Sequence, residues 1–381
     1  MVAYHKPRQR ISRLIPLAEA LAIVDASTRP VAARNADLAA ACGRTLAADV
    51  IVTGPQPEAA LALRDGWAVR SQDTADAGSY APAPLSGALR IAAGEPMPAG
   101  TDAVAPEETV LCRGELAESV APIAPGDGVL LRAADAQAGH KLCLMGRRLR
   151  LIDQAVLRAV GIRQVGIREP RLRLVRGGRG GEVIAAAYEW LGRTLANEGA
   201  AVRHNVGAAP GQSLAADQLA AAFRDETSDA IFVVGGTGTG STDMSVAALA
   251  TFGQVKFHGV ALLPGQTAAF GLAGTKPVLL FPGRLDAALA VWLTLGRRLL
   301  ERIAGSQMDE AVSMAELSRK IASPLGMAEI VPVRRRGNSA EPLAGGYLSL
   351  SSLAAADGWI FIPDHSEGWP AGTQVAVRPL A

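Results

Sequence analysis

The sequence predicts a multidomain protein that combines one α/β domain with two β-rich parts. Between residues 171 and 308, apolar strand-like runs alternate with helix-like segments, which is typical of a parallel sheet covered by helices on both faces. Between 51 and 140, short alternating runs are broken by proline and glycine, which indicates a loop-heavy β module. From about 309 the pattern is β-like again, so we expect a small β-barrel to close the chain.

These sequence patterns divide the 381 residues into four parts. Residues 1–50 together with 141–170 form a helical connecting region, and 51–140 form an inserted β-rich module. Residues 171–308 form the α/β domain, and 309–381 form the C-terminal β-barrel. A chain of this length can bury several separate cores.

Two helices are expected to open the chain. Apolar residues recur at helical spacing in the segment RLIPLAEALAIVDA, where Glu19 and Asp25 interrupt the apolar run. That pattern predicts an amphipathic helix rather than a signal peptide. A second helical pattern follows Asn35, which has the chemistry of an N-cap. A third, from residue 149, ends at Gly161, as a helix with a C-terminal glycine does.

Composition excludes several classes of function. Hydrophobic residues make up 49% of the chain and charged residues 19%, which indicates a soluble globular protein. Aromatic content of 4% and a net charge of +2 argue against a nucleic-acid-binding protein. No apolar run approaches the roughly 18 residues of a membrane span, so we expect a cytoplasmic protein with no membrane partner. The three cysteines and five histidines are scattered, which fits neither a disulfide framework nor a transition-metal site.

The most informative stretch is VVGGTGTGSTDMS, residues 233–245, which overlaps the end of the apolar run 230–234. We expect a strand, a glycine turn and a helix, because glycine lets the backbone take positive φ and approach a ligand closely. Exposed amide groups and the positive end of the helix dipole would favour a phosphate or another oxyanion there. The alternative is a tight strand-to-helix turn with no ligand.

Two familiar phosphate-binding signatures do not fit this stretch. A P-loop requires a lysine before its hydroxyl residue, and here Ser241 follows Gly240 directly. A dinucleotide fingerprint requires an acid about 20 residues after its glycines, and no Asp or Glu occurs between Asp243 and Asp286. Asp243 itself suits Mg²⁺ or a hydrogen-bond donor such as the amino edge of a pterin, unless it only caps the helix.

Several blocks of the sequence occur together in one order. Asp65–Val69 reads DGWAV, residues 90–108 read RIAAGEPMPAGTDAVAPEE, residues 131–149 read LRAADAQAGHKLCLMGRRL, and residues 281–289 read FPGRLDAAL. The glycine stretch contributes Gly235, Gly236, Thr237, Gly238, Thr239, Gly240, Ser241 and Asp243. This series resembles the MoeA and gephyrin E-domain family, the molybdopterin molybdenumtransferases, whose corresponding loop reads G-G-x-S-x-G-x-x-D. The likeness spans nearly the whole chain.

The resemblance implies a MoeA-like architecture and a reaction. The architecture comprises a helical and extended connecting region, an inserted β module, a three-layer α/β molybdopterin-binding domain and a C-terminal β-barrel. The family forms elongated homodimers, with a cleft between the α/β domain of one subunit and the inserted module of the other. The implied reaction transfers molybdate onto the dithiolene of adenylylated molybdopterin, with Mg²⁺ assisting and AMP released.

The resemblance also implies site residues. Acids that the family places around its cleft correspond to Asp65, Asp135, Glu182 and Asp243, and Asp243 is a candidate Mg²⁺ ligand. The implied cofactor-binding residues are Gly235, Gly236, Thr237, Gly238, Thr239, Gly240, Ser241, Pro282, Gly283 and Arg284. Taken alone, Asp65 and Asp135 are equally well explained as turn formers. Glu182 rests on a weaker match, because LVRGGRGGEV replaces the family's x-S-T-G-D-E-L.

The chain also departs from the family's pattern. Leu263 and Gln266 stand where the family has two lysines in K-P-G-K-P, and neither residue carries a charge that would hold an oxyanion. Arg284 replaces the family's asparagine and offers a cation, unless it pairs with the neighbouring Asp286. Arg64 is a second candidate for a compensating cation.

Two functions of different class follow from these matches and losses. The first is an active molybdenumtransferase that uses arginines in place of the lysines. The second is a non-catalytic paralogue that binds molybdopterin and serves as a carrier or assembly partner of a molybdoenzyme. The retained acids favour the first function, and the lost lysines favour the second. Under either, the expected partners are a pterin, an oxyanion and a second copy of the chain.

Overall fold

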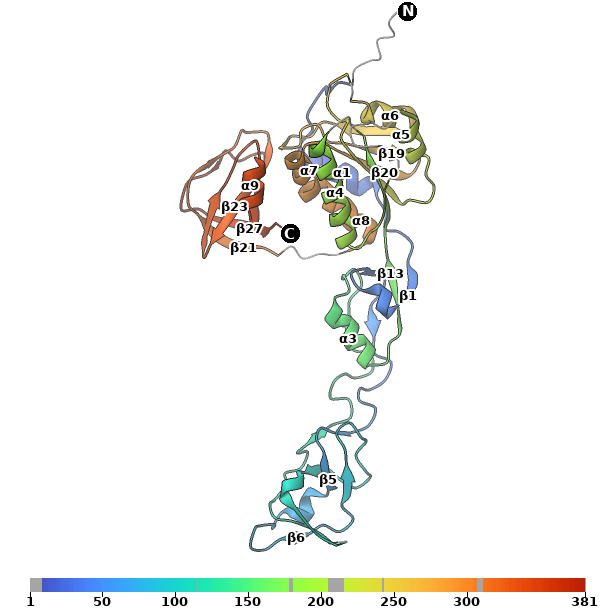
Figure 1. Ribbon diagram of the computed structural model, residues 1–381, viewed down its shortest axis with the longest axis vertical. Coiled ribbons are helices and arrows are strands. Elements are labelled where there is room, and N and C mark those ends of the chain that lie inside the picture. The colour runs from blue at the N-terminus through green and yellow to red at the C-terminus, as the bar shows by residue number, and fades with distance from the viewer. Residues whose placement is uncertain are drawn as a thin grey trace, which may run out of the picture. The chain divides into compact units, whose positions relative to one another are not determined.

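The computed structural model describes residues 9–114, 116–177, 181–204, 216–241, 243–306 and 311–380 (Figure 1). The chain forms two compact units. The first unit consists of Met1–Ala48, Met145–Gln154 and Gln164–Ala381, and the second of Asp49–Leu144 and Ala155–Arg163. The finer division into four parts stays a prediction.

A six-stranded mixed sheet lies at the centre of the first unit, in the order β15-β14-β16-β20-β19-β17. Its strands are β14 (Arg171–Arg176), β15 (Ala201–His204), β16 (Ala230–Val234), β17 (Gln254–His258), β19 (Ala269–Ala273) and β20 (Lys276–Phe281). The strands β15, β14, β16 and β20 are parallel, as the alternation predicts, but β19 runs antiparallel to both of its neighbours, β20 and β17. Only Gly274 and Thr275 connect β19 to β20, and so short a connection joins antiparallel strands only.

Helices cover both faces of this sheet, as expected (Figure 1). They are α1 (Leu17–Ser27), α4 (Glu182–Asn197), α5 (Ala216–Phe223), α6 (Ser245–Phe252), α7 (Leu285–Val291), the π-helical turn η3 (Trp292–Gly296) and α8 (Arg297–Ala304). Along β16, Phe232 and Val234 pack in one core with α1, α4, α7 and α8, whereas Ile231 and Val233 pack in a second core with α5 and α6. A strand buried on both faces requires apolar residues at every position, which is why this segment is a continuous apolar run.

A five-stranded barrel forms the C-terminal part of the first unit. Its strands are β21 (Ser313–Leu317), β23 (Ala328–Arg336), β24 (Ser339–Pro342), β25 (Gly358–Ile362) and β27 (Gln374–Pro379), beside the short pair β22 (Ile321–Ala322) and β26 (Gly368–Trp369). The sheet closes because β25 pairs with both β27 and β23. β18 (Leu262–Leu263) runs parallel to the start of β23 and attaches the barrel to the α/β domain. The predicted barrel is therefore confirmed.

Two segments whose sequence is strand-like do not form single strands. The segment VKFHGVALL, residues 255–263, is not one strand, because Gly259 has a φ of 108° and separates β17 from β18. The segment GYLSL, residues 346–350, leads into helix α9 (Leu350–Ala355) instead of a strand. Ser349 Oγ accepts a hydrogen bond from the Ser352 amide at 3.1 Å, so an N-cap overrides the alternation here.

The connecting region of the first unit contains the clearest correction to the sequence analysis. Asn35 is not an N-cap, because it lies in β1 (Arg34–Asp37) and pairs with Gly166 of β13 (Gln164–Arg168). Only a single helical turn, α2 (Leu38–Ala41), follows before β2 (Thr45–Leu46) completes a three-stranded sheet. Pairing with a strand more than a hundred residues later outweighs the local helical pattern.

The two other helices of this region are present. α1 begins after Pro16, so the described residues before it, 9–15, are extended rather than helical, and residues 1–8 lie outside the described part. α3 (Leu151–Ala159) is followed by Gly161, which has a φ of 81° and donates its amide hydrogen bond to the Arg158 carbonyl at 3.0 Å. The predicted glycine C-terminus of this helix is therefore confirmed.

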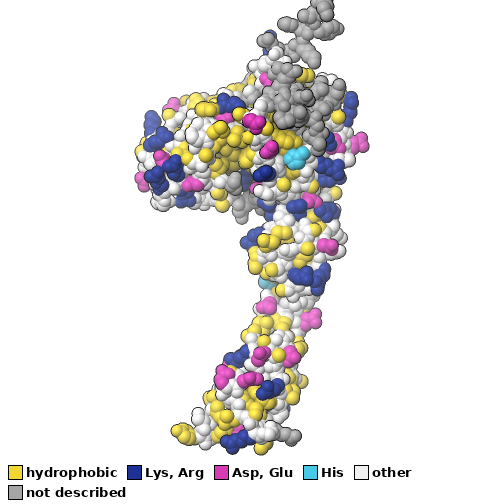
Figure 2. Space-filling view, in the orientation of Figure 1, with side chains coloured by type: hydrophobic (Ala, Val, Ile, Leu, Met, Phe, Trp, Pro, Cys, Tyr) yellow, Lys and Arg dark blue, Asp and Glu magenta, His cyan; other side chains and the backbone are white. Residues whose placement is uncertain are grey.

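The second unit is β-rich and loop-heavy, as the proline and glycine pattern predicts. Its short sheets have the orders β7-β5-β8, β6-β10-β9, β11-β4 and β12-β3. The strands are β3 (Val50–Ile51), β4 (Leu61–Ala62), β5 (Gly66–Val69), β6 (Ala83–Pro84), β7 (Leu89–Ile91), β8 (Ala103–Ala105), β9 (Val110–Arg113), β10 (Leu116–Ser119), β11 (Val129–Leu130) and β12 (Lys141–Cys143), with 3₁₀ turns η1 (Ser71–Thr74) and η2 (Glu107–Thr109). Basic and acidic side chains are intermingled on the face drawn in Figure 2, in line with the net charge of +2. In the described ranges, no helix is both long and apolar enough to span a membrane.

We expect Asp225 to make the stability of the first unit depend on pH. Burial alone would raise the pKa of its carboxyl, but hydrogen bonds from Thr227 and the charge of Arg173 lower that pKa from 3.8 to about 2. The stabilisation is therefore complete above pH 4 and is lost as the pH falls through about 2. Asp225→Asn should reduce the free energy of unfolding by about 2 kcal/mol at pH 7 in urea denaturation, and by less at pH 3. The exposed Asp76→Asn is the control, and an equal loss at both pH values would contradict the interpretation.

Candidate functional site

The carboxyl edge of the parallel strands in the first unit contains a cavity of about 560 Å³. Its walls come from the start of α4 after β14, the glycine turn after β16, the loop after β20, and Thr267 before β19. The lining residues are Gly181, Glu182, Val183, Ile184, Gly236, Thr237, Gly238, Asp243, Thr267, Pro282, Gly283 and Arg284. Ligands of α/β sheets bind outside the carboxyl ends of the strands, so this cavity is the candidate site.

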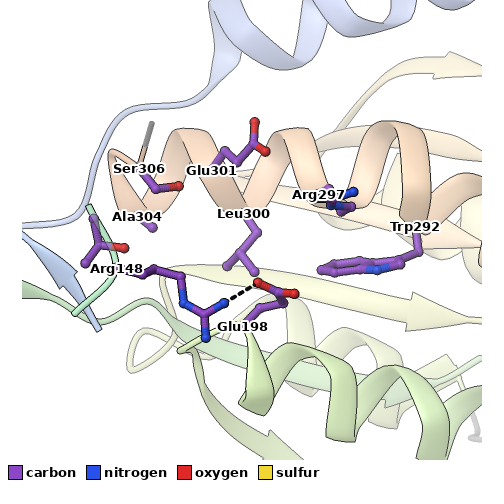
Figure 3. Close-up of a pocket in the computed structure, with 9 residues that line it drawn as sticks. Arg148, Glu198, Trp292, Arg297, Leu300, Glu301, Ala304 and Ser306 are labelled. Carbon is purple, nitrogen blue, oxygen red and sulfur yellow. Dashed lines mark hydrogen bonds and ion pairs between the residues drawn. The ribbon is translucent and has the colours of Figure 1, made fainter. Parts of the chain in front are cut away.

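Two further hollows in the described part of the first unit fit a ligand site less well. A larger one, of about 870 Å³, is lined by Asp229 and Lys276 at the amino ends of β16 and β20, the opposite edge of the sheet. Figure 3 shows the other, of about 10 Å³, in which Arg148 pairs with Glu198 at 2.7 Å. A hollow of that size holds one water molecule at most.

The carbonyl oxygens at the start of the glycine turn point into the protein. The Ser245 hydroxyl donates to the Gly235 carbonyl at 2.9 Å, and the Ser245 amide donates to the Gly236 carbonyl at 3.0 Å. His258 Nε2 lies 2.8 Å from the Thr237 carbonyl and donates to it. These bonds fix the orientation of three consecutive peptide groups.

Three amide groups of the same turn have no acceptor among the described residues. The Gly235 amide donates to the Phe281 carbonyl at 2.8 Å, which continues the contact between β16 and β20. Within the described residues, the amides of Gly236, Thr237 and Gly238 donate to no protein acceptor, and all three residues line the cavity. Consecutive free amides in a glycine turn form a nest that binds an anion.

Two glycines of the turn adopt positive φ, and one of them has no room for a side chain. Gly235 and Gly236 have φ angles of 91° and 73°, which other residues rarely adopt. A Cβ atom on Gly236 would lie 2.4 Å from Ser245 Oγ and 2.5 Å from the Gly177 carbonyl oxygen. The close approach of these three segments therefore requires glycine at position 236.

Two of the four predicted acids line the cavity. Asp243 is half-buried, and its Oδ2 accepts a hydrogen bond from the Gly240 amide at 3.0 Å. It does not cap α6, because Met244 occupies the N-cap position and makes no capping hydrogen bond with its side chain. Glu182 is the exposed first residue of α4. The cavity therefore combines two carboxylates with the free amides of the turn.

Arg284 lines the cavity together with Pro282 and Gly283, and its charge is already partnered. Its Nε and Nη2 lie 3.1 Å and 2.7 Å from the two carboxylate oxygens of Asp286, which is 4% exposed. The hydrogen bond to Asp286 raises the pKa of the guanidinium. The guanidinium also stacks on the Tyr347 ring at 4.6 Å. The ion pair that the sequence offered as an alternative is the observed one.

The remaining predicted residues lie outside the cavity lining. Thr239, Gly240 and Ser241 are exposed in the turn. Asp65 and Asp135 are exposed residues of the second unit, where Asp65 Oδ1 accepts from the Ala93 amide at 2.8 Å and the Asp135 amide donates to Gln56. Both acids thus take part in turns of their own unit.

Arg64 is not a free cation that could replace the family's lysines, because it is already bonded within the second unit. Its Nη2 lies 2.6 Å from the Val104 carbonyl oxygen and 2.9 Å from Asp127 Oδ2, both in the second unit. Leu263 is half-buried in β18, and Gln266 is exposed. Among the described residues that line the cavity, Arg284 is the one cation.

Family models match the chain in three consecutive stretches. Residues 15–161 match the MoeA N-terminal region, domains I and II; residues 158–302 match the probable molybdopterin binding domain; and residues 314–380 match the MoeA C-terminal region, domain IV. The chain belongs to the MoeA family. The MoeA-like architecture inferred from the sequence is therefore confirmed, with its α/β domain and closed C-terminal barrel.

Individual relatives agree with this assignment. The crystal structure of a molybdopterin biosynthesis MoeA protein from Pyrococcus horikoshii is 26% identical, covers 96% of this chain and 99% of its own, and has a TM-score of 0.75. A molybdopterin molybdenumtransferase of Synechococcus elongatus is 23% identical over 94% of this chain and 98% of its own length. A molybdopterin biosynthesis protein of Methanocaldococcus jannaschii is 33% identical over 40% of this chain and 36% of its own length.

Sequence reasoning missed several residues that shape the site of this MoeA-family protein. Ser245 and His258 hold the glycine turn, and Thr267 Oγ1 lies 2.9 Å from Thr237 Oγ1 across the cavity wall. Ser245 follows the motif within two residues of Asp243, so its position was a usable signal. His258 and Thr267 carry no local signal, because tertiary folding alone brings them to the turn.

Gly236→Ala should disrupt the turn. The new Cβ would clash with Ser245 Oγ and the Gly177 carbonyl and would require a positive φ, which costs roughly 1–3 kcal/mol. Chemical denaturation should show this loss. The matched control is Gly54→Ala, because no atom lies within 4 Å of a Cβ built there. Equal stability of the two variants would show that the turn is not tightly packed.

Proposed function

We propose that this MoeA-family protein is a molybdopterin molybdenumtransferase, which inserts molybdate into adenylylated molybdopterin and releases AMP. The observation that carries the proposal is the cavity at the carboxyl edge, which combines three free backbone amides with two carboxylates. Family membership places the chain in molybdenum cofactor biosynthesis, and a relative that matches 94% of this chain is named a molybdopterin molybdenumtransferase. Molybdopterin and molybdate are its substrates.

The amides of Gly236, Thr237 and Gly238 bind the phosphate side of the substrate in this proposal. Neutral N–H donors can bind a phosphate without a lysine, because each contributes a charge-assisted hydrogen bond to the oxyanion. The N-terminus of α4 lines the same cavity through residues 181–184, and the positive end of this 16-residue helix adds to the attraction. Donors of this kind offset part of the loss of charge at Leu263 and Gln266.

Asp243 and Glu182 serve the rest of the substrate. A carboxylate accepts hydrogen bonds from the amino edge of a pterin, and Asp243 has Oδ1 free for this after Oδ2 holds the Gly240 amide. The same two acids fit Mg²⁺, which usually binds one or two carboxylates together with substrate phosphate and water. The described residues contain no cluster of three or more metal-ligating side chains, which suits a metal shared with the substrate. Mg²⁺ bound there would neutralise charge on the phosphoryl oxygens.

A homodimer, a cytoplasmic location and catalytic roles of Asp65 and Asp135 belong to the proposal through the family resemblance. Helix α3 supports the homodimer, because it leaves Leu151, Ile152 and Val156 exposed at 73%, 59% and 41%. Apolar side chains gathered on one short helix are typical of a contact surface.

The second candidate is a MoeA-like carrier that binds molybdopterin without turning it over. The observation that favours it is the lack of a free cation: Arg284, the one cation among the described residues that line the cavity, is paired with Asp286, and Leu263 and Gln266 at the family's lysine positions are neutral. Molybdate is an anion, and its transfer requires positive charge or an equivalent set of donors close to the reacting atoms. The carrier needs only the amide nest and the two acids.

Incubation of the protein with adenylylated molybdopterin, Mg²⁺ and molybdate should release AMP. Chromatographic measurement of AMP tests the proposal directly, with molybdate omitted as the control. Measurable pterin binding without AMP release would identify the carrier instead. Absence of both binding and release would remove both candidates.

Asp243→Asn should reduce AMP release roughly 100-fold, the scale expected for one positioned charged group in an active site. Asparagine keeps an oxygen for the Gly240 amide, so the melting temperature should stay close to that of the unchanged protein. Asp76→Asn, an exposed change elsewhere, is the control. A large drop in melting temperature with unchanged activity per folded molecule would mean that Asp243 is only structural.

A further inference from the structure

The Gln9 side chain, at the start of the described part of the chain, hydrogen-bonds to two carbonyl groups of the glycine turn. Gln9 Nε2 lies 2.8 Å from the Gly236 carbonyl oxygen and also donates to the Gly238 carbonyl. Gln9 Oε1 accepts a hydrogen bond from the Ala247 amide, in the first turn of α6, at 3.3 Å. The residue is 9% exposed. A glutamine amide has two N–H donors, so both are used on the turn.

Together with two other residues, Gln9 binds every carbonyl group of residues 235–238. With Ser245 on Gly235 and His258 on Thr237, the carbonyls of all four residues 235–238 accept hydrogen bonds from donors outside the turn. Three residues of the turn line the cavity, namely Gly236, Thr237 and Gly238. Gln9 binds the carbonyls of the first and the third. The peptide amides of these residues are the groups left without a protein acceptor.

The segment that carries Gln9 is itself fixed to the protein. The Ile15 amide donates to the Gly259 carbonyl at 3.2 Å, and the Ala261 amide donates to the Ile15 carbonyl at 2.8 Å. A Cβ on Gly259 would lie 2.6 Å from Ile11 Cγ2, so residues 9–15 pack closely against this glycine. The strap, residues 9–15, therefore packs against the residue that follows His258, which also binds the turn.

The turn requires such a restraint. Gly235 and Gly236 both have positive φ, and glycine peptides rotate at little cost. Rotation of one peptide plane would place a carbonyl oxygen in the cavity in place of an amide, and that oxygen would repel an anion. The Gly236 carbonyl shares a peptide plane with the Thr237 amide, and the Gly238 carbonyl shares one with the Thr239 amide. Gln9 therefore restrains the two peptide planes that flank the Thr237–Gly238 peptide, which His258 holds.

We propose that Gln9 is a positioning residue, which keeps the amides of residues 236–238 directed at an oxyanion ligand. The inference rests on the proposed function only in that both use this nest, and it adds a determinant of affinity that lies outside the cavity. Its role is to set the geometry of the nest before the ligand arrives. Binding energy is then not lost to ordering of the turn.

The test uses inorganic phosphate as the probe on the full-length chain, with ¹⁵N-labelled protein and calorimetric titration. In the unchanged protein, phosphate should shift the amide resonances of Gly236, Thr237 and Gly238. Gln9→Ala should weaken phosphate binding roughly tenfold, as expected for the loss of hydrogen bonds that preorganise the nest. Gln9→Glu should weaken it further, because a carboxylate cannot donate to the two carbonyls and adds negative charge.

Gln154→Glu is the matched control, because Gln154 Nε2 also donates to a backbone carbonyl, that of Leu38, at 2.8 Å but does not touch the turn. This control should bind phosphate as the unchanged protein does. Unaltered affinity in both Gln9 variants, or a loss no greater than in the control at equal melting temperature, would overturn the positioning role and leave the transferase proposal standing. Failure of the unchanged protein to bind phosphate would overturn the nest itself. If the unchanged protein binds phosphate, the Gln9 variants bind it more weakly and the unchanged protein still releases no AMP, the transferase proposal alone would be contradicted.

Discussion

The candidate site depends on one constraint: the carbonyl oxygens of residues 235–238, directly after β16, all accept hydrogen bonds from the protein. A glycine turn exposes donors and acceptors in equal number, so it attracts an anion only when its acceptors are turned away. Ser245, His258 and Gln9 impose that asymmetry from three separate segments. The turn thus acquires a net donor character without any charged side chain, and this is what would let the proposed site bind an oxyanion without the lysines of the MoeA family.

The α/β sheet provides the rigidity that this constraint requires. β16 is buried on both faces, and its last residues hydrogen-bond to β14 and β20 on either side. The turn therefore starts from a fixed point. Asp243 closes the other end through the Gly240 amide, without capping α6. The acid is consequently held at the cavity by the same loop that supplies the amides, so the distance between carboxylate and nest does not depend on another domain.

The sequence predicted the features that depend on residues close together in the chain. The continuous apolar run of β16, the glycines after it and the helical period of α4 indicated the layers and the location of the turn, because burial and backbone freedom act over a few residues. The Arg284–Asp286 pair was also foreseen as one of two alternatives, since the residues are two positions apart. Family motifs then connected Glu182 with Asp243.

The features that were missed depend on contacts between distant segments. Asn35 was expected to cap a helix, but its pairing with Gly166 makes it a strand residue. Gln9 lies 227 residues from Gly236, and nothing in the surrounding basic segment indicates that its side chain enters the glycine turn. Ser349 shows the converse case, in which a local cap overrode an apparent strand pattern.

The attachment of the barrel through β18 has a consequence for engineering. Val260 and Leu262 share a hydrophobic core with Ala328, Ile330 and Trp359 of the barrel. Truncation of the chain before the barrel would expose these apolar residues and leave the backbone of β18 unpaired, so the isolated α/β domain would be prone to self-association.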